Sequence, residues 1–300
     1  MKKNKEIELS AVLKVLAYFQ VFQYPLSKEE IAHYTKFEEE KIAVQLNSLV
    51  QEEKIFIIDG YYSLLNNPSL VRERISGSWR AKTFASKALK RANFIGKFPF
   101  VRGVYISGSF SKGVVNEGGD VDYFVISKHN RLWISRTILI LYKKIFLFNS
   151  RKFFCLNYFI SDQNLEISQK NIFTATELFT LIPMVNTTLH QKLLKDNKWA
   201  EDFYDFKKIK PLKVKPFKIS TFQSFIELFF NGKLGERLDI HLMKKTLMRW
   251  KRKFPEMENY DFKIAFKSTR NVSKHHPSNF QKKVLEKYEN NLKLIKLKNV

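Results

Sequence analysis

The sequence has a single cysteine, a shortage of acidic residues and no long apolar run. Cys155 alone cannot form an internal disulfide, and its isolation excludes a zinc site built on several cysteines. The most apolar helix expected, 132–148, is too short to span a membrane and is interrupted by Arg136, Lys143 and Lys144. The first residues, MKKNKEIELS, alternate charged with apolar side chains, which is unlike a signal peptide. We therefore expect a cytoplasmic protein with no transmembrane segment.

The shortage of acidic residues is confined to one part of the chain. Against 29 Asp and Glu stand 53 Lys and Arg, which gives a formal net charge of +24. Residues 1–75 contain 10 basic and 11 acidic residues and are nearly neutral, so the whole excess lies from residue 76 onward. With 44% hydrophobic residues the chain is globular and not disordered. A positive field after residue 76 would attract a nucleoside triphosphate, a nucleic acid or an anionic surface.

A strand, a turn and a second strand are predicted in residues 104–127, VYISGSFSKGVVNEGGDVDYFVIS. The first residues are apolar and favour a strand, and Gly108 then allows a sharp turn that a side chain would block. Ser109 and Ser111 place hydroxyl groups beside backbone N–H groups. That combination suits a bound phosphate.

The second strand of this segment begins with two aspartates. Asp120 and Asp122 alternate with Val121, so both carboxylates share one face and Val121 points into the core. Two carboxylates on one face repel each other unless a cation lies between them. Carboxylate oxygens are ligands for Mg²⁺, and the pair therefore predicts a magnesium site; the alternative is a solvated strand end.

The order and spacing of these residues resemble a known family. Gly108-Ser109, ten intervening residues and Asp120-Val121-Asp122 resemble the signature of the DNA polymerase β-like nucleotidyltransferase superfamily. The resemblance implies that Asp120 and Asp122 hold two Mg²⁺ ions. It also implies that the turn, with Ser111 and Lys112 as further contacts, holds the triphosphate of a nucleotide such as ATP. The implied reaction moves a nucleoside monophosphate to an acceptor and releases pyrophosphate.

One position departs from the pattern of the family, which usually has a third carboxylate on the next strand. We predict this strand over 152–161, KFFCLNYFIS, with Asn157 at the inward-facing polar position. Asn157 can orient a hydroxyl or a water, but an amide is a poor general base. Asp162, just beyond the strand, is an alternative third carboxylate. The departure leaves a second interpretation open, a catalytically weak nucleotide- or RNA-binding module of the same fold.

The whole chain is expected to have an α+β fold in three parts. Residues 1–70 are predicted to form a winged-helix-like domain, with three helices and a hairpin that turns at Asp59-Gly60. The central part, 71–190, would be a nucleotidyltransferase domain with a mixed sheet and flanking helices. Residues 191–300 would form a basic helical domain.

The winged-helix arrangement is often used to read DNA, but its expected third helix, 37–51, is acidic at its start. Glu38, Glu39 and Glu40 lie where a recognition helix should carry positive charge. We therefore favour a structural or protein-interaction role, with a DNA-binding regulator as the alternative.

Helical periodicity predicts helices over 69–97 and 132–148 and a largely apolar helix over 171–190, broken near Pro183. Glu177 lies inside this last helix and needs a partner. It either pairs with one of the abundant lysines or borders the active site. The remaining expected elements are a connector over 191–220, a helix over 221–254 with a break at Asn231-Gly232, a short strand or loop over 263–270, and a basic closing helix over 277–294.

The helix over 221–254 carries a basic series at roughly helical spacing, namely Lys244, Lys245, Arg249 and Arg252. The positive charge exceeds what one nucleotide requires, so we predict an anionic acceptor that lies against this helix. The alternative is attachment to an anionic membrane surface through the basic helices of the C-terminal part.

Overall fold

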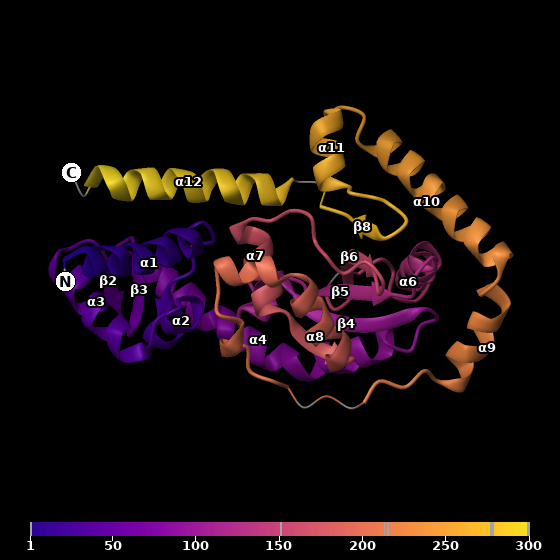
Figure 1. Cartoon of the computed structure of the whole chain (residues 1–300), viewed down its shortest axis with the longest axis horizontal. Helices are drawn as coiled ribbons and strands as arrows, with labels where there is room; N and C mark the ends of the chain where they lie inside the picture. Colours follow the sequence, from indigo (N-terminus) through magenta and orange to yellow (C-terminus); the bar gives the residue numbers. More distant parts are fainter. Residues whose placement is uncertain (1, 151, 213, 215, 277–278, 299–300) are drawn as a thin grey trace.

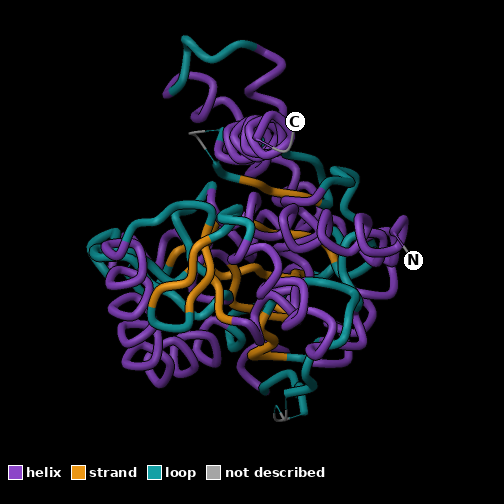
Figure 2. Tube along the Cα trace, turned by 90° about the vertical axis from the view of Figure 1, so that its left-hand side faces the viewer, coloured by secondary structure: helices purple, strands orange, loops and turns teal. Residues whose placement is uncertain are grey.

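The computed structural model describes residues 2–150, 152–212, 214, 216–276 and 279–298. It contains a three-stranded sheet in the order β1-β3-β2 and a five-stranded sheet in the order β7-β4-β5-β6-β8. Figure 1 shows the small sheet and its helices beside the central sheet, and Figure 2 shows the strands enclosed by helices. This architecture confirms the α+β fold class.

The N-terminal part contains the three helices and the hairpin that the sequence predicts. Its elements are α1 (Lys2–Gln20), β1 (Leu26–Ser27), α2 (Lys28–Tyr34), α3 (Glu39–Gln51), β2 (Phe56–Ile58) and β3 (Tyr61–Ser63). Ser27 and Glu30 form a reciprocal capping box that fixes the start of α2. Asp59 and Gly60 both have positive φ, 50° and 78°, as a tight hairpin turn requires. The assignment of this part as a winged helix stays a prediction.

The central sheet is built around β4 (Val101–Ser107), β5 (Asp122–Ser127) and β6 (Cys155–Ser161). β4 and β5 are antiparallel, whereas β5 and β6 are parallel. A parallel pair needs a crossover, which α6 (Leu132–Phe146) supplies. The long helix α4 (Pro68–Ile95) precedes β4. The strand predicted over 152–161 is present, but β6 begins only at Cys155.

The prediction of one broken helix over 171–190 was wrong. This segment forms α7 (Ile172–Thr180), β7 (Ile182–Val185) and the first part of α8 (Thr187–Asp196). β7 is an edge strand that pairs with β4, and Pro183 is tolerated there because an edge strand has unpaired N–H positions. The expected connector over 191–220 likewise begins inside α8 and continues through two short 3₁₀ helices, η1 (Lys198–Asp202) and η2 (Phe206–Lys208).

The C-terminal part packs against both the N-terminal part and the central sheet with its helices. It consists of α9 (Thr221–Phe230), α10 (Lys233–Lys253), α11 (Asn259–Ala265), β8 (Val272–Lys274) and α12 (Phe280–Lys298). The predicted break at Asn231-Gly232 is confirmed. The strand or loop expected over 263–270 starts inside α11 and then forms a loop, and β8, which was not predicted, joins the central sheet beside β6. The predicted start of the last helix, Pro277, lies outside the described residues.

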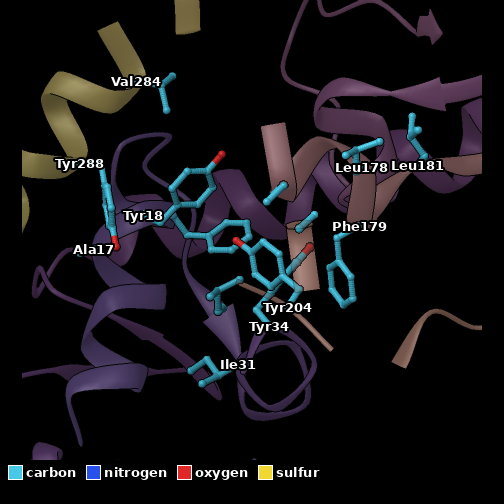
Figure 3. Packing of buried hydrophobic residues seen from close by; sticks show 14 of the residues in the cluster. Ala17, Tyr18, Ile31, Tyr34, Leu178, Phe179, Leu181, Tyr204, Val284 and Tyr288 are labelled. Carbon is cyan, nitrogen blue, oxygen red and sulfur yellow. The ribbon is translucent and has the colours of Figure 1, made fainter. Parts of the chain in front are cut away.

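Two hydrophobic clusters cover the two faces of the central sheet. One joins the N-terminal helices, α7 and α12 to Tyr105, Phe124 and Ile126 of the sheet. The other joins α4, α6, α10 and α11 to the opposite face. Figure 3 shows side chains of α1, α7 and α12 meeting in the first cluster, where the rings of Tyr18 and Tyr288 have centroids 5.7 Å apart. The limits of the three predicted domains, at residues 70 and 190, stay a prediction.

Within the described part of the chain, no helix has both the length and the apolar character needed to cross a membrane.

Candidate active site

The turn after β4 brings the backbone against a carboxylate. β4 ends at Ser107, and Gly108 begins the short helix α5 (Gly108–Ser111) with φ +69°. A Cβ atom at Gly108 would lie 2.5 Å from Oδ2 of Asp122, which is closer than any real contact of this kind. The positive φ therefore favours glycine here, and any side chain would also have to displace the Asp122 carboxylate.

The two aspartates meet as the alternation predicts. Val121 is fully buried, and one ligand atom each from Asp120, Asp122 and Cys155 lie within 4.8 Å of one another. Cys155 comes from β6, where it pairs in register with Asp122. This acidic cluster could bind a metal ion, with the two carboxylates as the donors that suit a hard cation. The sequence reasoning used Cys155 only to exclude other chemistry and did not place it in the site.

Burial and mutual repulsion disturb the protonation of this cluster. Burial and, to a smaller extent, the negative charge of Asp120 together raise the pKa of Asp122 to about 7. Burial also raises the pKa of the Cys155 thiol, as do the charges of Asp122 and Asp120, so the thiol stays neutral near pH 7. A cation at the cluster would therefore compete with the proton on Asp122.

Asn157 lies beside Asp122, where the third carboxylate was expected. Its Nδ2 donates a hydrogen bond to Oδ1 of Asp122 at 2.9 Å and lies 3.1 Å from Sγ of Cys155. The register of β5 and β6 shifts at this point, between Tyr123 and Phe124. The amide thus orients the Asp122 carboxylate and cannot take up a proton.

Asp162 is too far from the cluster to replace the missing carboxylate. Its backbone N–H donates to the carbonyl of Ser127, the last residue of β5, and its Oδ1 accepts from the N–H of His129. Asp122 is the first residue of β5, so five residue steps, about 16 Å of strand, separate the two ends. The alternative prediction, that Asp162 supplies the third carboxylate, is therefore wrong.

Glu177 fulfils both alternatives that its sequence position suggested. Its Oε1 pairs with Nζ of Lys112 at 2.7 Å, and its Oε2 accepts from the N–H of Gly108 at 3.1 Å. It therefore pairs with a lysine and also borders the site. A carboxylate here occupies donors of the turn that the resemblance assigns to a phosphate.

The other two residues of the turn have different roles. Ser111 Oγ donates to the carbonyl of Gly108 at 2.8 Å, which supports the turn from within. Ser109 is exposed, so its hydroxyl is open to a ligand. The Lys112 ammonium group is held by the Glu177 carboxylate and by the carbonyl of Gly108, so of the predicted side-chain contacts only the Ser109 hydroxyl is exposed.

A cavity of about 260 Å³ adjoins the cluster and reaches a residue that sequence reasoning missed. Asp120, Asp122 and Glu177 line it together with Lys274 from β8. Lys274 is only 4% exposed, and its Nζ donates to the amide oxygens of Gln169 (3.0 Å) and Gln281 (2.7 Å). Burial, together with the positive charge of Lys267, lowers the pKa of Lys274 to about 8. No sequence signal marks this lysine, because β8 is three residues long and was not predicted.

Comparison with known proteins supports the central resemblance. Residues 86–226 match the nucleotidyltransferase domain family. No curated protein and no solved structure matches the chain. The matched residues include β4, β5, β6 and the Gly108 turn, whereas the N-terminal 70 residues lie outside the match. The site described above therefore lies in the part of the chain that matches a nucleotidyltransferase domain. This match is consistent with the polymerase β-like resemblance and indicates transferase activity.

Proposed function

We propose that the protein transfers a nucleoside monophosphate from a nucleoside triphosphate to an acceptor and releases pyrophosphate, with Mg²⁺ as the metal. The observation that carries the proposal is the close approach of Gly108 to Asp122, which belongs to the acidic cluster with Asp120. This approach would set a backbone suited to a phosphate against a cluster suited to a metal ion. When bound, Mg²⁺ would neutralise charge on the attacking and leaving oxygens.

Each residue of the site would have a separate task. Asp120 and Asp122 would hold the metal, and Asn157 would fix the orientation of Asp122. The N–H of Gly108, the hydroxyl of Ser109 and the ammonium group of Lys112 would bind the β- and γ-phosphates, which requires Glu177 to release two of these donors. An acceptor oxygen would then bond to the α-phosphorus, the bond from that phosphorus to the bridging oxygen would break, and pyrophosphate would leave with the electron pair.

The direct test uses the full chain with Mg²⁺, each nucleotide labelled at the α-phosphate and a wide panel of acceptors. Nucleotidyl transfer predicts that pyrophosphate appears and that label moves to an acceptor. Nucleotide binding without pyrophosphate, across the whole panel, would instead favour the catalytically weak nucleotide- or RNA-binding module that Asn157 suggests.

We expect metal affinity to depend steeply on pH. Because the pKa of Asp122 is about 7, a proton competes with the metal below that pH. The apparent affinity for Mg²⁺ or Mn²⁺ should fall by about tenfold for each pH unit below 7 and level off above it. Calorimetric titration between pH 5.5 and 8.5 measures this, and an affinity that is equal at both ends would contradict it.

We expect Gly108→Ala to raise the KM for nucleotide by about tenfold, since the new methyl group must push the Asp122 carboxylate aside. Gly113→Ala is a matched control: Gly113 also has a positive φ, +78°, but an added Cβ would have no neighbour within 4 Å. The control carries the same backbone strain without the collision. Equal effects of the two substitutions on KM would show that the contact with Asp122 is irrelevant.

We infer that residues 1–70 form a winged-helix-like domain with a structural role. In support, Glu38, Glu39 and Glu40 are exposed at the start of α3, where they would repel the phosphates of DNA. The hydroxyl of Tyr24 donates to the carbonyl of Lys112, so this part touches the turn that would bind the triphosphate. A cytoplasmic location stays a prediction.

A further inference from the structure

A second and larger cavity, of about 940 Å³, lies between α6, α10 and the start of β6. Cys155 and Asn157 line both this cavity and the smaller one, so the two adjoin beside the Asp122 carboxylate. Among the described residues that line the larger cavity there is no Asp or Glu, but there are seven basic side chains. They are Arg136, Lys143, Lys144, Lys245, Arg249, Arg252 and Lys253.

Arg136 gives this cavity the character of a built anion site. It is 8% exposed, and its guanidinium carbon lies 4.8 Å from the ring centroid of Trp250 and 5.7 Å from that of Trp133. No carboxylate of the described chain pairs with it. A buried cation without a counter-charge is costly, and a bound anion would offset that cost.

The positively charged neighbours of Arg136 increase the free-energy cost of burying its charge. Burial, together with the charge of Arg249, lowers the pKa of Arg136 to about 10. Desolvation also lowers the pKa of Lys144, together with the charges of Arg249 and Arg136. All three side chains line the cavity, and a phosphate dianion bound there would offset their mutual repulsion.

The residues at the end of the cavity next to Asp122 restrict the kind of nucleophile that can react there. A hydroxyl must lose a proton before or as it attacks, and the third-carboxylate position holds an amide, Asn157, that donates to Asp122 and takes up no proton. A phosphomonoester has a second pKa of about 6, so its oxygens are already ionised at neutral pH. A phosphate nucleophile therefore needs no general base at Asn157.

We propose that the acceptor is a small phosphomonoester whose phosphate lies among Arg136, Lys144 and Arg249, and that an oxygen of this phosphate attacks the α-phosphorus. This inference rests on the proposed nucleotidyl transfer and names its acceptor class. The new bond joins the acceptor oxygen to the α-phosphorus, the bond to the bridging oxygen of the β-phosphate breaks, and pyrophosphate leaves with the electron pair. The product is a phosphoanhydride, and no proton needs to be removed.

The size and chemistry of the cavity favour a small acceptor over the end of a nucleic acid. A volume of about 940 Å³ lies within the range of small-molecule sites, which is about 300–1,000 Å³. The end of an RNA or DNA strand presents a hydroxyl, which would again require the missing base.

Binding is tested first, without nucleotide, by calorimetry on the full chain. The probes are inorganic phosphate, glucose 1-phosphate, ribose 5-phosphate and phosphoserine, with the unphosphorylated parents as controls. We expect phosphorylated probes to bind more tightly than their parents, and Arg249→Gln to weaken that binding by about tenfold. Arg249 is exposed, so the substitution should leave the fold intact, and Lys251→Gln, on the same helix but outside the cavity, is the matched control. Equal effects of the two substitutions, or no preference for phosphate, would overturn the inference.

Transfer is tested next with α-labelled nucleotide, Mg²⁺, the same probes and a short oligonucleotide with a free 3′ hydroxyl. We expect labelled product with the phosphomonoesters and not with their parents, in a form that alkaline phosphatase does not degrade. With inorganic phosphate the product would be a nucleoside diphosphate, which the phosphatase does degrade. Label on the oligonucleotide or on an unphosphorylated parent would overturn the inference while leaving the proposed function standing. No label with any acceptor would overturn both the proposed function and the phosphate nucleophile, whereas the binding experiment separately decides whether the cavity is an anion site.

Discussion

Replacing Asp122 with Asn is expected to reduce nucleotidyl transfer by about 1,000-fold and to stabilise the metal-free protein. Activity falls because an amide cannot supply the charged oxygen that a divalent metal requires. Stability rises because the pKa of Asp122 is raised from 3.8 to about 7 in the folded state. Such a group lowers the free energy of unfolding as the pH increases through that interval, and the variant lacks this loss.

Two measurements on the same variant separate these effects. Transfer of α-label reports the activity, and thermal unfolding without metal at pH 5 and pH 8 reports the stability. Asp162→Asn serves as the control, because Asp162 lies beyond the opposite end of the β5–β6 pair and should affect neither. Wild-type turnover in Asp122→Asn would refute the assignment of the active site, and a variant less stable than the wild type at pH 8 would refute the electrostatic argument.

Replacing Glu227 with Ala is expected to lower the free energy of unfolding by about 3 kcal/mol. Glu227 lies on α9 and is 4% exposed. Its Oε1 accepts from the N–H of Phe100 at 2.6 Å and from Arg102 Nη1 at 2.9 Å, and its Oε2 accepts from Arg102 Nη2 at 2.5 Å. Removal of the carboxylate would leave the largely buried guanidinium of Arg102 without a counter-charge and a buried N–H without an acceptor.

Urea unfolding measures this change, with the ion pair of Glu166 and Lys170 as the comparison. That pair has a similar N–O distance, 2.9 Å, but both side chains are more than half exposed. Glu166→Ala should therefore cost less than about 0.5 kcal/mol. Comparable losses in the two variants would mean that burial adds nothing to the contact between α9 and β4.

The sequence by itself determined the features that depend on neighbouring residues. The alternation of Asp120, Val121 and Asp122 fixes two carboxylates on one side, since side chains alternate along an extended chain. Gly108 marks the turn because few other residues adopt a positive φ without strain. The capping box at Ser27 and the break at Asn231-Gly232 follow from equally local chemistry. The resemblance to nucleotidyltransferases rests on this kind of local information.

Only the tertiary structure decided which distant residues share the site. The parallel register of β5 and β6 places Cys155 and Asn157 beside Asp122, and a three-residue strand brings Lys274 to the same cavity. The residues around Pro183 form the strand β7 because they pair with β4 at the edge of the central sheet. Strand formation depends on partners and burial more than on intrinsic preference, so such positions are not encoded in nearby residues. The basic cavity arises for the same reason, because the packing of α6 on α10 leaves Arg136 without an anionic partner among the described residues.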